Sequence, residues 1–246
     1  MSYLPTARGA ERESVFGARL GRHWDRLLDR GHRLAIAAAA KPYRAIGSIL
    51  LLNVVLIATF ILAGDLLFSD RAEFFRELMP GTWLSFAELL FVAVIAWSIQ
   101  LAARGERRIR LDNFWGLTAA VFAFFAFDEI TQLTVFLSAA LTSLGALAPD
   151  GFRDLDAFLL SVLFLAAAAG MLRHIGDLLP HRAAIVVLGI GVMLGATSQT
   201  LDSVFASTSG EFVAEESLKL AAEPFLIGGY LVVLQSFLAV RRPPRP

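Results

Sequence analysis

Long apolar stretches divide this chain into six blocks, and short polar or charged connections separate them. Each block is close to the ~20 residues that an α-helix needs to cross the hydrocarbon core of a bilayer. The pattern predicts an all-α fold, namely a polytopic membrane helical bundle with six transmembrane helices. The predicted spans are Ala45–Phe68, Trp83–Ala103, Phe114–Leu137, Leu155–Leu172, Ala183–Ala206 and Ser217–Val240.

The segment before the first span combines apolar and basic positions at helical spacing, which predicts an N-terminal amphipathic helix at the inner surface. Two surfaces are open to such a helix: anionic lipid headgroups, or the inner loops of the protein itself. Pro42 is expected to end it. The arginines predicted to face the lipid surface are Arg19, Arg22, Arg26 and Arg30.

The basic residues lie on alternate connections: 18 fall on one side of the predicted membrane and 3 on the other. By the positive-inside rule the richer side is cytoplasmic, so both termini are expected there. This gives a basic cytoplasmic segment at 1–44, a six-helix domain at 45–240 and a cytoplasmic tail at 241–246. Arg outnumbers Lys 20 to 2, which favours GC-rich coding DNA and hence a bacterial inner (plasma) membrane.

The amino-acid composition argues against several kinds of functional site. The chain has no Cys, which excludes disulfides, thiolate nucleophiles and thiolate metal sites. All four His residues fall at predicted cytoplasmic positions, which argues against ligation of haem or chlorophyll within the spans. We expect no nucleic-acid partner, although the formal net charge of zero argues neither for nor against one. No nucleophile elbow, phosphate-binding loop or zinc-protease motif is present, so the sequence leans away from an enzyme.

Acidic residues within the spans are the main candidate chemistry. A charge at the bilayer centre costs at least ~2.5–3.5 kcal/mol, so such residues are retained for a reason. Carboxylates without His or Cys suit a proton or a hard cation such as Ca²⁺ or Mg²⁺. By the predicted topology, all of them fall between the midplane and the outer side. They are Asp65, Glu88, Asp128, Glu129, Asp202 and Glu223.

Local spacing groups some of these residues into a predicted site. On the sixth span Glu216, Lys219 and Glu223 share one helix face. Pro224 lacks an amide proton and therefore frees the carbonyl of Leu220, one turn earlier. We expect Asp128 and Glu223 to approach each other near Lys219, and any metal to lie between them. The predicted ion- or proton-binding residues are Asp128, Glu129, Gln132, Asp202, Glu216, Lys219 and Glu223.

Three functions remain open at this point. The first is an ion- or proton-binding protein of the transport class, which uses the surplus of acids over Lys219. The second is a non-catalytic accessory subunit of a larger membrane complex, or a homo-oligomer, in which the same charges form an internal network that fixes helix register. An intramembrane enzyme is the third.

One resemblance accompanies these hypotheses. The Asp128–Glu129 pair within the aromatic run Phe124–Gln132, together with the segment Glu215–Leu220, resembles a group of small multi-span bacterial membrane proteins. In that group a His often follows the acidic pair, whereas this chain has Thr131 and Gln132, which puts a metal role in doubt. The resemblance implies a membrane bundle and no particular function.

Overall fold

The computed structural model is a bundle of long helices, as the hydrophobic pattern predicts, and it contains no strand among the residues it describes. Those residues are 26, 28–76, 79–104, 109–145, 155–173, 178–179, 181–204 and 209–240. The elements are α2 (Pro42–Phe68), the 3-10 turn η1 (Glu73–Phe75), α3 (Pro80–Arg104), α4 (Ile109–Thr131), α5 (Leu133–Ser143), α6 (Leu155–Arg173), α8 (Arg182–Val204) and α9 (Ser209–Val240).

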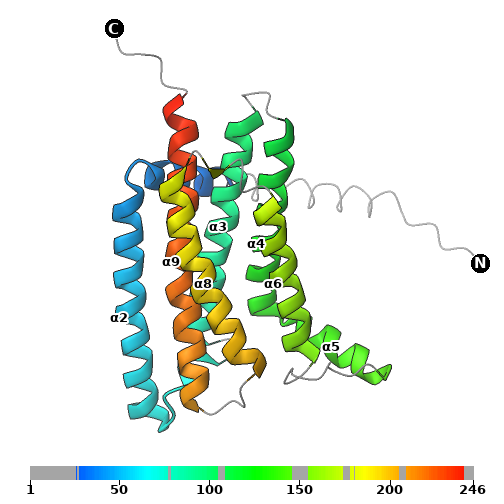
Figure 1. Ribbon diagram of the computed structural model, residues 1–246. Helices are drawn as coiled ribbons and strands as arrows, with labels where there is room; N and C mark the ends of the chain where they lie inside the picture. Colours follow the sequence, from blue (N-terminus) through cyan, green and yellow to red (C-terminus); the bar gives the residue numbers. More distant parts are fainter. Residues whose placement is uncertain are drawn as a thin grey trace, which may run out of the picture.

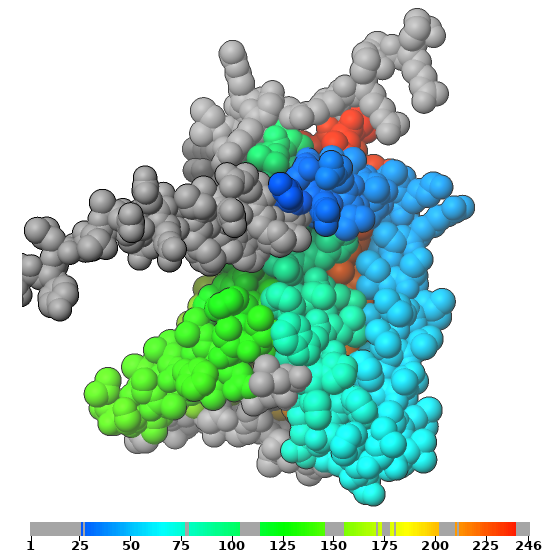
Figure 2. All heavy atoms as spheres, turned by 180° about the vertical axis from the view of Figure 1, so that it is seen from behind, coloured from blue at the N-terminus to red at the C-terminus, as the bar shows by residue number. Residues whose placement is uncertain are grey.

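The helices α3 and α9 form the centre of the bundle. They contact each other, and α4 packs on α3 while α8 and α2 pack on α9 (Figure 1). The first residues of α2 and the last residues of α9 lie at the same end of the bundle. The arrangement leaves α2 at an outer edge (Figure 2), where its Leu51, Leu62 and Leu66 are 63–82% exposed.

Among the residues that the structure describes, five helices are long and apolar enough to cross a membrane: α2, α3, α4, α8 and α9. The exposed Leu and Val side chains of α2 are what a lipid-facing helix requires, because lipid tails are as apolar as these side chains. The apolar part of α6 that the structure describes, Leu155–Gly170, is shorter than the other five. The structure therefore supports a helical membrane protein with at least these five candidate spans.

The prediction that the third span is one continuous helix is wrong. Instead of one helix over Phe114–Leu137, α4 ends at Thr131 and α5 begins at Leu133. Gln132 between them takes the left-handed backbone conformation, with φ 53°. The helix α5 then runs away from the bundle (Figure 1), and its Phe136 is 67% exposed. An amphipathic or apolar period cannot reveal such a break, because both pieces remain apolar.

The N-terminal segment is described from residue 28, apart from Arg26, and is helical over 28–39. This part packs on α3: Ala35 and Ala39 are fully buried, and His32 Nδ1 lies 2.8 Å from Ser98 Oγ. One of the two expected surfaces was the inner loops of the protein, and the observed contact is with the helix α3 instead. Arg26 and Arg30 are exposed, while Arg19 and Arg22 lie outside the described residues.

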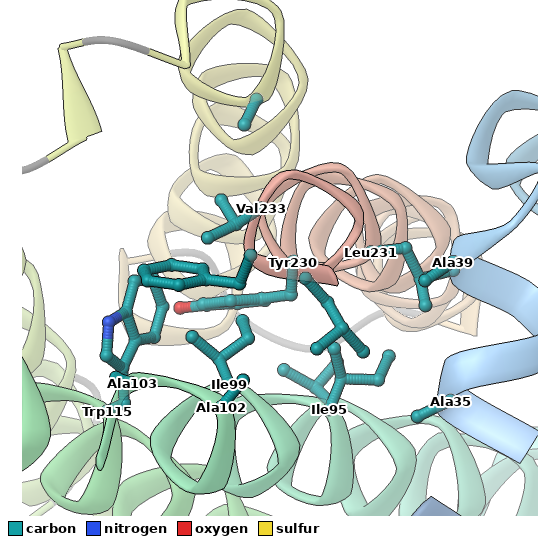
Figure 3. Packing of buried hydrophobic residues seen from close by; sticks show 14 of the residues in the cluster. Ala35, Ala39, Ile95, Ile99, Ala102, Ala103, Trp115, Tyr230, Leu231 and Val233 are labelled. Carbon is teal, nitrogen blue, oxygen red and sulfur yellow. The ribbon is translucent and has the colours of Figure 1, made fainter. Parts of the chain in front are cut away.

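The main apolar core lies between α3, α4 and α9 (Figure 3). Tyr230 is its centre, with ring centroids 5.9 Å from Trp115 and 5.7 Å from Phe122 in edge-to-face geometry. Ile95 and Leu231 are also fully buried there. This core occupies the later halves of α3 and α9, and their earlier halves hold the polar residues described next.

Glycines allow the helices around α9 to approach closely. A Cβ on Gly191 of α8 would lie 3.1 Å from the Ala222 carbonyl oxygen, so the backbones of α8 and α9 are nearly in contact. On α9 itself, a Cβ on Gly228 would collide with Ile46 of α2, and one on Gly229 would collide with Leu188 of α8.

Candidate functional site: a buried carboxyl cluster

Two carboxyl groups meet in the interior where α3 and α9 pack together. Glu88 of α3 is 7% exposed and Glu223 of α9 is 1% exposed. Ser85 precedes Glu88 by one helical turn, and its Oγ donates a hydrogen bond to Glu223 Oε1 at 2.6 Å. The Glu88 and Glu223 carboxyl groups are near enough to hydrogen bond to each other. Three polar groups that are usually exposed are therefore packed into one buried cluster.

Asn53 connects α2 to this cluster. Its Nδ2 donates to Glu88 Oε2 at 3.0 Å and to the Leu220 carbonyl oxygen at 2.7 Å. Because the carbonyl can only accept, the amide orientation of Asn53 is fixed with its nitrogen toward these partners. Leu220 is the residue four before Pro224, and the free backbone acceptor predicted from the proline is confirmed by this bond.

Two acceptor atoms in the cluster lack a donor among the described residues: Asn53 Oδ1 and Glu223 Oε2. Both side chains are at least 99% buried, so bulk water does not solvate them. If both carboxyl groups were ionised they would also repel each other, since two unit charges at a separation of about 4 Å repel by about 4 kcal/mol at an effective dielectric of 20. The Glu88 and Glu223 carboxyl groups therefore need either a nearby positive charge or a bound proton.

The basic residue of the cluster is occupied elsewhere. Lys219 Nζ lies 2.8 Å from Glu216 Oε1 and 3.2 Å from Glu129 Oε1. Glu129 comes from α4, so this group joins α4 to α9. Glu223 follows Lys219 by four residues on the same helix face, and the two charges interact without a direct ion pair. The Lys219 ammonium thus interacts with the carboxyl groups of Glu129, Glu216 and Glu223, and it forms ion pairs with the first two.

Asp128 has a different role from the predicted one. Its Oδ1 accepts from the backbone N–H of Thr134 at 2.8 Å, and its Oδ2 accepts from Thr134 Oγ1 at 2.7 Å. The carboxylate thereby caps the first turn of α5, whose amides have no partner within that helix. The acid that meets Glu223 is Glu88, so the structure does not bring the predicted pair Asp128 and Glu223 together.

The structure brings some of the other predicted site residues together and places others elsewhere. Glu129, Glu216 and Lys219 lie together with Glu223 in reach, whereas Gln132 forms the helix break. Asp202 lies on α8, and its side chain is outside the part that the structure describes. Within the described residues, no group of three His, Cys, Asp or Glu side chains is arranged to hold a metal ion, which gives the predicted metal at Asp128 and Glu223 no support.

Sequence reasoning left Glu88, Ser85 and Asn53 out of the site. A signal existed for each: Ser85 and Glu88 lie three residues apart on one face of α3, and Asn53 is the deepest polar residue of α2. No sequence rule showed that these faces turn toward α9. Their helices are joined by packing, which periodicity alone does not specify.

The five long apolar helices and this cluster match what is expected of a class, that of helical membrane proteins with buried ionisable groups. Comparison with models of protein families, with curated proteins and with solved structures finds no match to the chain.

Proposed function

We propose that this protein is an integral membrane protein of the transport class that binds a proton or a cation at the Glu88–Glu223 cluster. One observation carries the proposal: two carboxyl groups are buried together while the one nearby ammonium, Lys219, is paired with Glu129 and Glu216. Ionisable residues within membrane helices are costly and mark ion or proton sites by default.

The finer features of the proposal come from the sequence. The 18-to-3 distribution of basic residues supports six crossings with both termini in the cytoplasm, in which α6 adds the fourth crossing in chain order to the five longer helices. The Arg-rich composition supports a bacterial inner membrane. Arg26 and Arg30 are exposed and so are available to anionic lipid at the inner face.

The test is ligand-dependent stability of the full chain in detergent. The thermal midpoint of the wild type should depend on pH or on added NaCl or CaCl₂, with choline chloride as the ionic-strength control. A ligand at 100 times its Kd contributes about 2.7 kcal/mol, or a shift of about 5 °C or more for a chain of this size. Glu223→Gln should remove that dependence, because it removes one ionisable partner and keeps the shape of the side chain.

Asp65→Asn is the matched control. Asp65 is also an acid near the end of a span, but its side chain is 52% exposed and its Oδ1 pairs with Arg71 Nε at 3.3 Å. This variant should keep the wild-type dependence. Equal pH and cation responses in wild type and Glu223→Gln would contradict ion binding and favour a purely structural network. Flux of the same ion in proteoliposomes then separates a transporter from a subunit that only binds it.

A further inference from the structure

The ion that this cluster takes follows from its unpaired atoms. Glu223 Oε1 already accepts from Ser85, while Glu223 Oε2 has no donor among the described residues. The nearest group able to supply one is the Glu88 carboxyl, which donates only when it is protonated. A buried acceptor without a donor carries the full cost of its lost hydration, so the geometry favours a hydrogen atom between the two carboxyls.

Neighbouring charged groups do not supply the donor that Glu223 Oε2 lacks. Among the described residues, the charged groups that face Glu223 are Glu88 from α3, Glu129 from α4, and Lys219 and Glu216 from its own helix. From α2 the cluster receives only the neutral amide of Asn53. Lys219 is held by two other carboxylates, so moving it to Glu223 would leave those two short of a partner.

A metal ion is a poorer fit than a proton. Ca²⁺ takes six to eight oxygen ligands. The pair offers two carboxyl groups, and Asn53 turns its nitrogen rather than its oxygen toward Glu88. Asn53 Oδ1 is the other acceptor without a donor, and a single water molecule bound there would satisfy it.

We propose, on the basis of the function proposed above, that Glu88 and Glu223 hold one proton between them and that H⁺ is the ion this site binds. One O–H bond forms on one carboxyl group, and the other carboxyl group accepts a hydrogen bond from it. The pair then carries one negative charge. Release of the proton to water breaks that O–H bond and leaves two negative charges, and no electron is transferred.

The experiment is infrared spectroscopy of the full chain in detergent near neutral pH, read in the C=O stretching region of protonated carboxylic acids. The difference spectrum between the wild type and Glu88→Gln/Glu223→Gln should contain one such band. The double variant should lose it, since Gln mimics a protonated acid in shape but carries no acidic proton. Asp128→Asn should retain the band, because the Asp128 carboxylate accepts two hydrogen bonds from Thr134.

Ser85→Ala keeps both acids and provides a second measurement if the double variant does not fold. Loss of the 2.6 Å bond from Ser85 should move the band in frequency without removing it, because the proton's neighbour changes while the proton remains. A band unaffected by Ser85→Ala, or a band still present in the double variant, would overturn the assignment.

The two proposals fail separately. If the wild type lacks the band, yet Na⁺ or Ca²⁺ raises its thermal midpoint at fixed pH and Glu223→Gln abolishes this, the site binds a metal cation. The proposed function then stands and the proton assignment falls. If the band is absent and neither pH nor cations change the midpoint through Glu223, both fall together.

Discussion

A single amide nitrogen, Asn53 Nδ2, joins three helices by donating to Glu88 on α3 and to Leu220 on α9. The consequences of Pro224 could be read from the sequence, because loss of its amide proton is a backbone rule that holds in any helix. The partner of the freed carbonyl could not, because it depends on which face of α2 turns inward. The same limit explains why Glu223 was assigned to Asp128 instead of Glu88.

Asp70, in the connection after α2, gives a prediction at the same scale. The backbone N–H of Ala72 and then the guanidinium of Arg76 lower the pKa of Asp70 below 3.8. The ionised form is thus favoured by folding, so its stabilising effect is complete above about pH 3.8 and is lost as the pH falls through the lowered pKa. The wild type should be more stable than Asp70→Asn above this pH.

Thermal midpoints of the two proteins, measured at successively lower pH, should therefore converge. Arg76→Gln serves as the comparison, since it removes the 2.6 Å contact to Asp70 but leaves the Ala72 amide in place. The difference in thermal midpoint between wild type and Arg76→Gln should therefore change less with pH than the difference between wild type and Asp70→Asn. A constant difference between wild type and Asp70→Asn at all pH values would show that this carboxylate does not respond as described.

At the scale of elements, helix type and approximate length followed from hydrophobicity, whereas the break at Gln132 did not. The break requires a left-handed residue and a cap supplied by Asp128 from the preceding helix. The sequence marked Asp128 only as a costly acid within a span. Because Asp128 caps α5, its presence within a span is explained without a bound ligand. Burial of an acid was therefore by itself a weak guide to the site.

Close packing around α9 predicts a large effect of one methyl group. Gly228→Ala would place its Cβ against Ile46, so α2 must move or Ile46 must change rotamer. Overpacking of this kind typically costs about 1–3 kcal/mol. Gly189→Ala on α8 is the control, because nothing lies within 4 Å of the added Cβ. It should change stability by less than about 1 kcal/mol, in the favourable direction.

Chemical denaturation in mixed micelles measures both variants. The contact of Gly228 with α2 predicts that the loss will be partly recovered when Ile46→Ala is added, because the smaller side chain makes room. Equal stability of Gly228→Ala and Gly189→Ala would contradict the close approach of α2 to α9.

At the scale of the whole molecule, polarity divides the bundle lengthwise. Ser85 and Glu88 come early in α3, and Glu223 comes before the apolar residues around Tyr230 in α9. The polar cluster therefore lies toward the end where both helices begin, and the apolar core lies toward the other end. The predicted topology makes the polar end the outer one.

Cysteine labelling tests that orientation cleanly, since the chain contains no Cys. In intact cells, a membrane-impermeant thiol reagent should label Glu73→Cys and should leave Gly105→Cys unlabelled until the cells are opened. The expectation rests on the excess of basic residues on the connection that contains residue 105. Labelling of Gly105→Cys in intact cells would reverse the orientation.

The bond from Asn53 to Leu220 also has a consequence for biogenesis, because its two residues are separated by 167 positions in the chain. A ribosome delivers α2 to the membrane long before it has made α9. Only Pro42, Asn53 and Gly64 of α2 are buried, so little else holds this helix in the bundle. Until α9 is made, Glu88 on α3 is the partner available to the Asn53 amide, and the docking of the first span is complete only after the last helix has been inserted.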